Sequence, residues 1–234
     1  MKSAHIGLIA AATLILAPYS NGAAATIPIA PRFTAFDTYV SAALDEYHVP
    51  GAAVAIVENG HVVFLKGYGV SDIAKNTRVD ADTVFQLASV SKTFTGVGAA
   101  MLVDERKLSW DRPIVAYLPR FVAYDPYVTR NMTVRDLLAH RTGWPKFTGD
   151  ILGDFGYSRA EVIRRLRYLK PAYSFREIAQ YSNFGYLVAG EVSARLAGMS
   201  WDEFVKKRIF DPLAMTRSST SLHCLTDADT AQPY

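Results

Sequence analysis

Apolar residues recur at helical spacing in several stretches of the chain, over residues 33–47, 94–102, 158–169 and 187–196. In the second stretch they fall at i, i+3, i+4, i+7 and i+8: Phe94, Val97, Gly98, Met101 and Leu102. This spacing places apolar side chains on one face of an α-helix. Gly198 follows the last stretch and is typical of a helix end. The pattern therefore predicts an amphipathic helix in each stretch.

A second pattern marks helix starts: a serine or threonine is followed three residues later by an acidic residue. In such a capping box, each of the two side chains accepts a hydrogen bond from the other residue's backbone N–H. The pattern occurs at Thr133 with Asp136, Ser158 with Glu161, and Ser200 with Glu203. We therefore expect helices to begin just after residues 133, 158 and 200.

Two predicted strands, residues 52–57 and 61–68, flank the dipeptide Asn59-Gly60. Asparagine and glycine tolerate the positive φ angles of a tight turn, so the strands are expected to pair as an antiparallel hairpin. A two-stranded hairpin is only marginally stable alone. We therefore expect further strands or a helix beside it.

The composition is that of a soluble globular protein with a sizeable core. Of the 234 residues, 50% are hydrophobic and 20% are charged, and the formal net charge is +3. No repeat or low-complexity linker divides the chain, which indicates one continuous domain. The arginines are mostly scattered, so no basic stripe of the kind that binds nucleic acid is visible.

The first 25 residues have the pattern of a secretory signal peptide. A basic start precedes an apolar run at residues 6–17, and alanines at 23–25 supply small residues for cleavage. We expect residues 1–25 to be removed, residues 26–234 to form the mature domain, and the protein to reach a periplasm or the medium. An uncleaved membrane anchor is the alternative, although the apolar run is short for a membrane span.

Two further features have ordinary explanations. The stretch 158–169 carries arginines outside its apolar stripe, at Arg159, Arg164, Arg165 and Arg167. A solvated helix face is the default interpretation, and attraction of an anionic substrate is the alternative. The lone Cys224 cannot form an intrachain disulfide. A small, partly buried residue is favoured over a nucleophile there, because no paired motif surrounds it.

The candidate chemistry begins with Ser89 and Lys92, three residues apart at the start of the helix predicted around Phe94. Residues at this spacing share a helix face, so the lysine can reach the serine hydroxyl and help to remove its proton. A helix start also presents free backbone N–H groups to a developing oxyanion. The alternative is a chance Ser-x-x-Lys sequence with an exposed lysine.

A second triplet, Tyr181-Ser182-Asn183, lies at the junction of a loop and the helix predicted over residues 187–196. A tyrosine hydroxyl placed between Ser89 and Lys92 could relay a proton, because a nearby ammonium favours the phenolate. Asn183 could orient Lys92 or a substrate amide. Taken alone, the triplet favours a core tyrosine with an asparagine cap. Together with Ser89 and Lys92, it favours a catalytic set.

These motifs resemble those of the serine β-lactamase and penicillin-binding protein superfamily, in particular its class C β-lactamase, esterase and D-aminopeptidase-like branch. The likeness covers nearly all of residues 33–234, and the ordered set is more specific than any one motif. The matching segments are residues 85–92 (FQLASVSK), 137–143 (LLAHRTG), 183–186 (NFGY) and 211–215 (DPLAM).

The resemblance implies an α/β (α+β) fold of the β-lactamase/transpeptidase type, an antiparallel sheet flanked by helices with a helical subdomain. It also implies that Ser89 is acylated, that Lys92 and Tyr181 share the acid/base work, and that Asn183 holds the substrate or Lys92. The Ser89 backbone N–H would be half of an oxyanion hole. No metal or cofactor is implied.

The Lys-Thr-Gly or His-Thr-Gly strand of that family does not follow Tyr181 in this sequence. That strand normally completes the oxyanion hole, so we expect a domain that lacks its C-terminal sheet strands and exposes an edge of the hairpin. Arg141-Thr142-Gly143 imitates the motif, but it precedes Tyr181 and its neighbours match a different loop. His140 is likewise interpreted as a structural loop histidine.

A Ser-His-Asp hydrolase is the competing enzyme class. The chain has no Gly-x-Ser-x-Gly elbow, no His-Glu-x-x-His metal site and no Glu-x-x-Leu-Asn segment. The sequence therefore favours an exported serine hydrolase that forms an acyl-enzyme at Ser89 with an ester, amide or β-lactam. Its partner would be a small-molecule or peptide substrate, and its oligomeric state is left open. A non-catalytic, truncated remnant of the family is the alternative.

Overall fold

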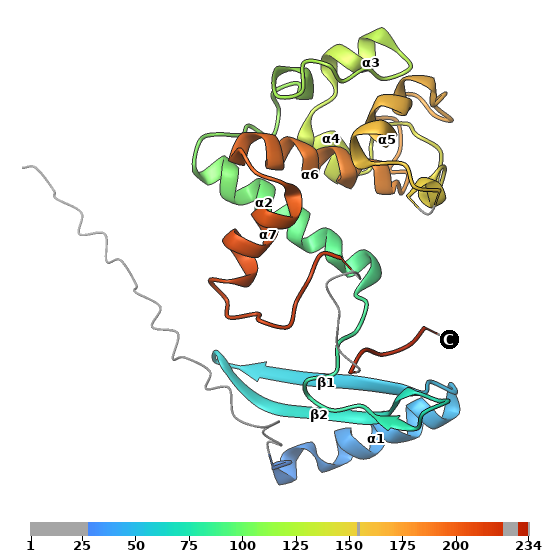
Figure 1. The fold of residues 1–234 in the computed structure, drawn as a ribbon, viewed down its shortest axis with the longest axis vertical. Helices are drawn as coiled ribbons and strands as arrows, with labels where there is room; N and C mark the ends of the chain where they lie inside the picture. Colours follow the sequence, from blue (N-terminus) through green and yellow to red (C-terminus); the bar gives the residue numbers. More distant parts are fainter. Residues whose placement is uncertain (1–27, 154, 222–228, 234) are drawn as a thin grey trace, which may run out of the picture.

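A computed structural model describes residues 28–153, 155–221 and 229–233. The predicted signal peptide and Cys224 lie outside these residues. Figure 1 shows two parts, which we call the sheet layer (residues 31–80) and the helical region (residues 88–215). The helix α2 (Lys92–Asp104) begins near the sheet layer and runs into the helical region.

The sheet layer contains the predicted hairpin. Its elements are α1 (Thr34–Glu46), β1 (Gly51–Glu58), β2 (His61–Asp72) and the short β3 (Thr77–Arg78). β1 and β2 pair antiparallel, and β3 adds to the other edge of β2. Asn59 and Gly60 form the turn with φ angles of 50° and 78°. The predicted helix and hairpin are confirmed, and β3 is an addition that the sequence pattern did not predict.

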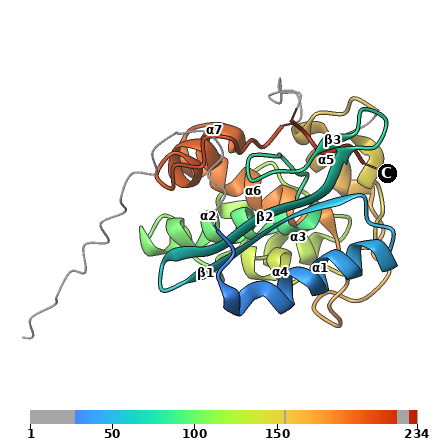
Figure 2. The ribbon, with the colours of Figure 1, turned by 90° about the horizontal axis from the view of Figure 1, so that it is seen from below.

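α1 covers one face of the hairpin, along which it runs in Figure 2. The ring of Phe36 meets the ring of the buried Phe64 edge-on at 5.6 Å. Beside it, the Asp37 carboxylate accepts hydrogen bonds from Lys66 Nζ at 2.6 Å and from the Tyr68 hydroxyl at 2.7 Å. An apolar contact and a polar cluster therefore fix the helix against β2.

The opposite face of β1 is open to water. Ala53 and Ala55 are exposed there, and Val57 is 61% exposed. Among the described residues β1 pairs only with β2, so its second edge has no strand partner.

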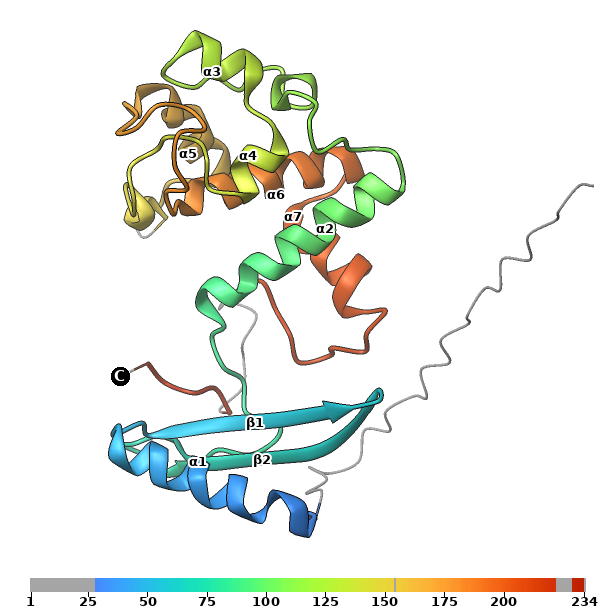
Figure 3. The ribbon, with the colours of Figure 1, turned by 180° about the vertical axis from the view of Figure 1, so that it is seen from behind.

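The α-helices of the helical region that follow α2 are α3 (Pro126–Asn131), α4 (Val134–Leu138), α5 (Arg159–Arg165), α6 (Asn183–Ala197) and α7 (Trp201–Val205). α6 lies at the centre of this region and contacts α2, α4, α5 and α7. Figure 3 shows this arrangement from behind.

The main apolar core lies in the helical region. Leu102, Leu137, Val188 and Phe204 are completely buried there. α2 comes close to Phe204 at Gly98, where a Cβ atom would lie only 2.6 Å from the phenylalanine ring. Gly98 thus lets α2 approach α7, and α2 also packs on α6. This packing brings the N-terminal ends of α2 and α6, which carry the candidate site, into a fixed relation.

The predicted helix starts are confirmed by the caps. Thr133 and Ser200 each form a complete capping box, whereas Ser158 only accepts from the Glu161 N–H. α5 ends at Arg165 and continues as a tight 3-10 turn. The arginines of this segment lie at the surface: Arg164 and Arg165 pair with Glu161, and Arg159 pairs with Asp202. These pairs agree with a solvated helix face.

The fold is thus an antiparallel sheet with α1 on one face and a helical region beside it, which agrees with the expected fold class. Within the described ranges, no helix is both long enough and apolar enough to cross a membrane.

Candidate active site

Ser89 lies in a 3-10 turn (Ala88–Ser91) that leads directly into α2. The turn brings the Lys92 side chain back over Ser89, and Lys92 Nζ lies 3.1 Å from Ser89 Oγ. Ser89 is exposed, whereas Lys92 is half-buried. The nucleophile candidate is therefore open to a substrate, while its neighbouring cation is held by the protein.

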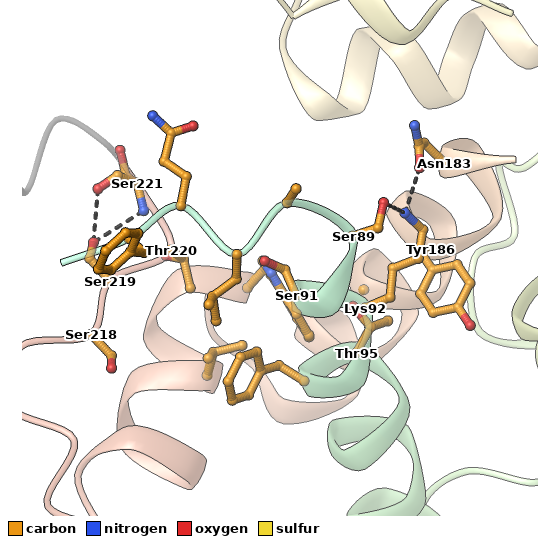
Figure 4. Close-up of a pocket in the computed structure, with 18 of the residues that line it drawn as sticks. Ser89, Ser91, Lys92, Thr95, Asn183, Tyr186, Ser218, Ser219, Thr220 and Ser221 are labelled. Atoms are coloured by element: carbon orange, nitrogen blue, oxygen red, sulfur yellow. Dashed lines mark hydrogen bonds between the residues drawn. The ribbon is translucent and has the colours of Figure 1, made fainter. Parts of the chain in front are cut away.

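Tyr181 and Asn183 approach the same lysine from the start of α6. The Tyr181 hydroxyl lies 2.5 Å from both Ser89 Oγ and Lys92 Nζ, and Asn183 Oδ1 lies 2.6 Å from Lys92 Nζ. A protonated lysine has three N–H donors, and each has one acceptor here. Figure 4 shows the amine between Ser89 and Asn183. The structure thus brings together all four residues singled out from the sequence.

The hydrogen bonds of this cluster change the pKa of Tyr181. The hydrogen bond from Lys92, and after it the hydrogen bond with Ser89, lowers the pKa of the Tyr181 hydroxyl below its usual range. A phenolate stabilised in this way, in contact with a serine hydroxyl, has the geometry of a general base. The Asn183 amide is committed to Lys92 and not to helix capping, and Tyr181 is only half-buried. The reading as a core tyrosine with an asparagine cap is therefore wrong.

The backbone at Ser89 supplies a further donor. In the described part of the chain, the Ser89 N–H donates to no other residue. A free amide on the nucleophile is suited to an oxyanion that forms at the carbonyl carbon attacked by Ser89.

The family model for Beta-lactamase matches residues 36–232. The chain belongs to the beta-lactamase family. Among similar proteins is the unguisins hydrolase ungD' of Aspergillus campestris, which is 34% identical over 195 residues, covering 80% of this chain and 36% of that protein. Another is penicillin-binding protein 4 of Amycolatopsis lactamdurans, which is 32% identical over 178 residues, covering 75% of this chain and 46% of that protein.

A solved relative supports the same fold. The D-alanine carboxypeptidase AmpC from Burkholderia cenocepacia superposes with a TM-score of 0.68 at 26% identity, covering 83% of this chain and 52% of that chain. This beta-lactamase-family chain therefore has the β-lactamase/transpeptidase-like fold. It spans only about a third to a half of the length of these relatives.

A cleft of about 1270 Å³ opens beside the cluster. Its walls include the start of β1 at Gly51, the candidate residues Ser89, Lys92 and Asn183, and the segment 217–221. In Figure 4, Ser218 to Ser221 lie across the cleft from Lys92 and Asn183. The sheet layer thus borders the cleft but contributes no side chain to the hydrogen bonds of the cluster.

The segment Arg141-Thr142-Gly143 is a structural loop in this beta-lactamase-family fold, as expected. Arg141 pairs with the fully buried Asp136, and the Thr142 hydroxyl accepts from the Trp144 N–H. The described residues contain no group of three or more His, Cys, Asp or Glu side chains that could hold a metal ion.

Two neighbours of the site were not singled out from the sequence as site residues. The Asn183 amide Nδ2 donates to Asp150 Oδ2 at 2.8 Å, which fixes which end of the amide faces Lys92. His140 packs its ring against Tyr181, at 4.7 Å between centroids. The sequence placed His140 in a loop, but it gave no signal that this loop returns to Tyr181.

Proposed function

We propose that this chain is a serine hydrolase that uses Ser89 to form an acyl-enzyme with an ester, amide or β-lactam. The observation that carries the proposal is the Tyr181 hydroxyl, which lies 2.5 Å from both Ser89 Oγ and Lys92 Nζ. A base in contact with the serine and stabilised by a cation is the arrangement that activates a hydroxyl nucleophile.

In the proposed acylation, the Tyr181 phenolate takes the Ser89 hydroxyl proton while Ser89 Oγ attacks the substrate carbonyl carbon. The resulting oxyanion accepts a hydrogen bond from the Ser89 N–H. The bond to the leaving group then breaks, and the leaving amine or alkoxide takes the proton from Tyr181. Lys92 remains charged throughout and keeps the phenolate stable.

Deacylation would reverse these roles. Tyr181 takes a proton from water, the hydroxide attacks the ester carbonyl, and Ser89 Oγ leaves with the proton returned by Tyr181. Asn183 holds Lys92 in place, and its position at the cleft allows it to contact a substrate amide.

Similarity to an unguisins hydrolase, a penicillin-binding protein and a D-alanine carboxypeptidase supports a hydrolase. Residues 1–25 further lead us to propose export to a periplasm or the medium. Small molecules and peptides are the substrates proposed.

The test is turnover of three substrate types by the purified chain: a p-nitrophenyl ester, a chromogenic cephalosporin and a peptide that ends in D-alanine. Ser89→Ala should abolish hydrolysis of whichever substrate is cleaved. Ser91→Ala is the matched control, because Ser91 also lines the cleft but takes no part in the hydrogen bonds of the cluster.

Equal turnover by wild type and Ser89→Ala would contradict the proposal. The absence of any turnover by folded wild-type protein would favour the alternative, a non-catalytic member of the family.

A further inference from the structure

His140 makes contact with the residues on both sides of Tyr181. The Gln180 N–H donates to the His140 carbonyl oxygen at 2.7 Å, and the Ser182 N–H donates to His140 Nδ1 at 3.2 Å. Between these two bonds, the imidazole ring lies 4.7 Å from the Tyr181 ring. His140 therefore holds Tyr181 in two ways. It binds the backbone N–H groups of the residues before and after Tyr181, and its imidazole packs against the Tyr181 ring.

The loop itself is anchored independently of the active site. Asp136 is fully buried and pairs with both Arg141 and Arg176. The Arg176 N–H also donates to the Arg141 carbonyl oxygen at 2.9 Å. The loop segments that carry Arg141 and Arg176 are thus joined through the Asp136 carboxylate and a backbone hydrogen bond. Arg141 directly follows His140 in the chain, so this anchor lies next to the contact between His140 and Tyr181.

The hydrogen bond from Ser182 requires His140 Nδ1 to be unprotonated, so the imidazole is neutral with its proton on Nε2. The charged and titratable groups that face it are Lys92 from α2 and the phenols of Tyr181 and Tyr186. The negative charge of Asp150 also reaches Tyr181, where it works to raise the pKa of the phenol. Burial, and after it the Lys92 charge, lowers the pKa of His140 below its usual range.

We propose that neutral His140 is the positioning residue for Tyr181, holding the phenol where it reaches both Ser89 and Lys92. His140 does not touch the reacting atoms. Its consequence for the rate rests on the proposed function, whereas its effect on the Tyr181 phenol does not. A displacement of about 1 Å in a catalytic group can cost about 100-fold in rate, so a modest loosening of Tyr181 is measurable.

The test uses His140→Asn, which removes the ring. Asparagine keeps a side-chain acceptor and tolerates the left-handed backbone that His140 adopts at φ 57°. His48→Asn is the matched control. His48 is also a histidine in the left-handed region, at φ 53°, but it is exposed at the end of α1 and far along the chain from the cluster.

The first readout is NMR of protein that carries ¹³Cζ-labelled tyrosine, with Tyr181→Phe to assign the signal. In wild type and in His48→Asn, the Tyr181 phenol should titrate below the usual value of about 10. In His140→Asn, its midpoint should rise towards that value, because the phenol leaves Lys92. An unchanged midpoint in His140→Asn would overturn the proposal.

The second readout is the rate at which a fluorophosphonate labels Ser89, which should fall about 10- to 100-fold in His140→Asn and stay unchanged in His48→Asn. If folded wild type is not labelled but the Tyr181 midpoint still shifts in His140→Asn, the proposed function fails and the positioning role stands. If wild type is labelled and the midpoint does not shift, the positioning role fails and the proposed function stands.

A measurement on wild type alone covers the case in which His140→Asn does not fold. ¹⁵N NMR of the histidine side chains at pH 7 should show His140 neutral, with Nδ1 unprotonated and Nε2 protonated. A charged imidazole, or a proton on Nδ1, would overturn the proposal.

Discussion

The helical region contains the main apolar core, whereas the sheet layer leaves one face of β1 exposed to water. Val188 on α6 is completely buried, but Val57 on β1 is 61% exposed. All four side chains of the hydrogen-bonded cluster belong to α2, α6 and the segments that lead into them. The better packed part of the molecule therefore organises the nucleophile, and the sheet layer only borders the cleft.

Because of this difference, we expect contacts within the helical region to control the reactivity of Ser89. A catalytic group must be held within a fraction of an ångström, and dense packing around it supplies that restraint. α2 and α6 pack on one another, so Lys92 and Asn183 meet at their N-terminal ends. Changes in the helical region should alter both stability and Ser89 reactivity, whereas changes on the open face of β1 should alter neither strongly.

Removal of the Lys92 amine should reduce the reactivity of Ser89 more than any other change considered. Lys92→Met keeps much of the side-chain volume but removes the cation that stabilises the Tyr181 phenolate. We expect fluorophosphonate labelling of Ser89 to slow by about 10²- to 10⁴-fold, the range of a lost acid/base partner. Lys107→Met, on the surface at the end of α2, is the control and should label at the wild-type rate. Equal rates for both variants would show that Lys92 has no part in activation.

Asp136→Asn should produce the next largest effect, on folding. The carboxylate is fully buried and pairs with Arg141 and Arg176, which are 40% and 41% exposed. Loss of one partner of a buried pair costs about 3–5 kcal/mol, and the exposure of the arginines favours the lower end, about 3 kcal/mol. Urea denaturation followed by circular dichroism would measure it. A loss under about 1 kcal/mol would contradict the anchoring role.

The same carboxylate should give a pH dependence. Burial alone would raise the pKa of Asp136, but hydrogen bonds from Arg176 and Thr133 outweigh it and hold the pKa below its usual range. Its stabilisation is therefore complete above the unfolded-state pKa of about 4 and is lost as the pH falls through the folded-state pKa. The difference in unfolding free energy between wild type and Asp136→Asn should shrink below pH 4. A constant difference down to pH 2 would contradict this.

A matched pair of valines should show the smallest effects and the sharpest contrast between the two regions. Val188→Ala removes buried methyl groups and should cost about 2 kcal/mol. Val57→Ala should change the unfolding free energy by less than about 0.5 kcal/mol, because most of the side chain already lies in water. Equal costs would mean that the open face of β1 is covered in solution.

Much of this architecture could be predicted from local patterns. The spacing of Phe94 and Leu102 indicated α2, and Asn59-Gly60 indicated the hairpin turn. β3 could not be predicted, because a strand of two residues has no periodicity. α5 ended before the predicted boundary because its last turn tightens to 3-10 geometry.

For the candidate site, the sequence named Ser89, Lys92, Tyr181 and Asn183, and the structure places them within hydrogen-bond distance. Their motifs could be found because each is short and local. The contacts of His140 with Tyr181 and of Asp150 with Asn183 depend on how separate loops fold back on α6. The spacing of residues in the sequence does not predict such contacts.

The most direct test of the central claim is intact-mass spectrometry of the folded chain after reaction with a fluorophosphonate. A hydroxyl activated by Tyr181 and Lys92 should give one adduct in wild type and in Ser91→Ala, and none in Ser89→Ala. An adduct that persists in Ser89→Ala, or no adduct on folded wild type, would contradict the claim that Tyr181 and Lys92 activate Ser89.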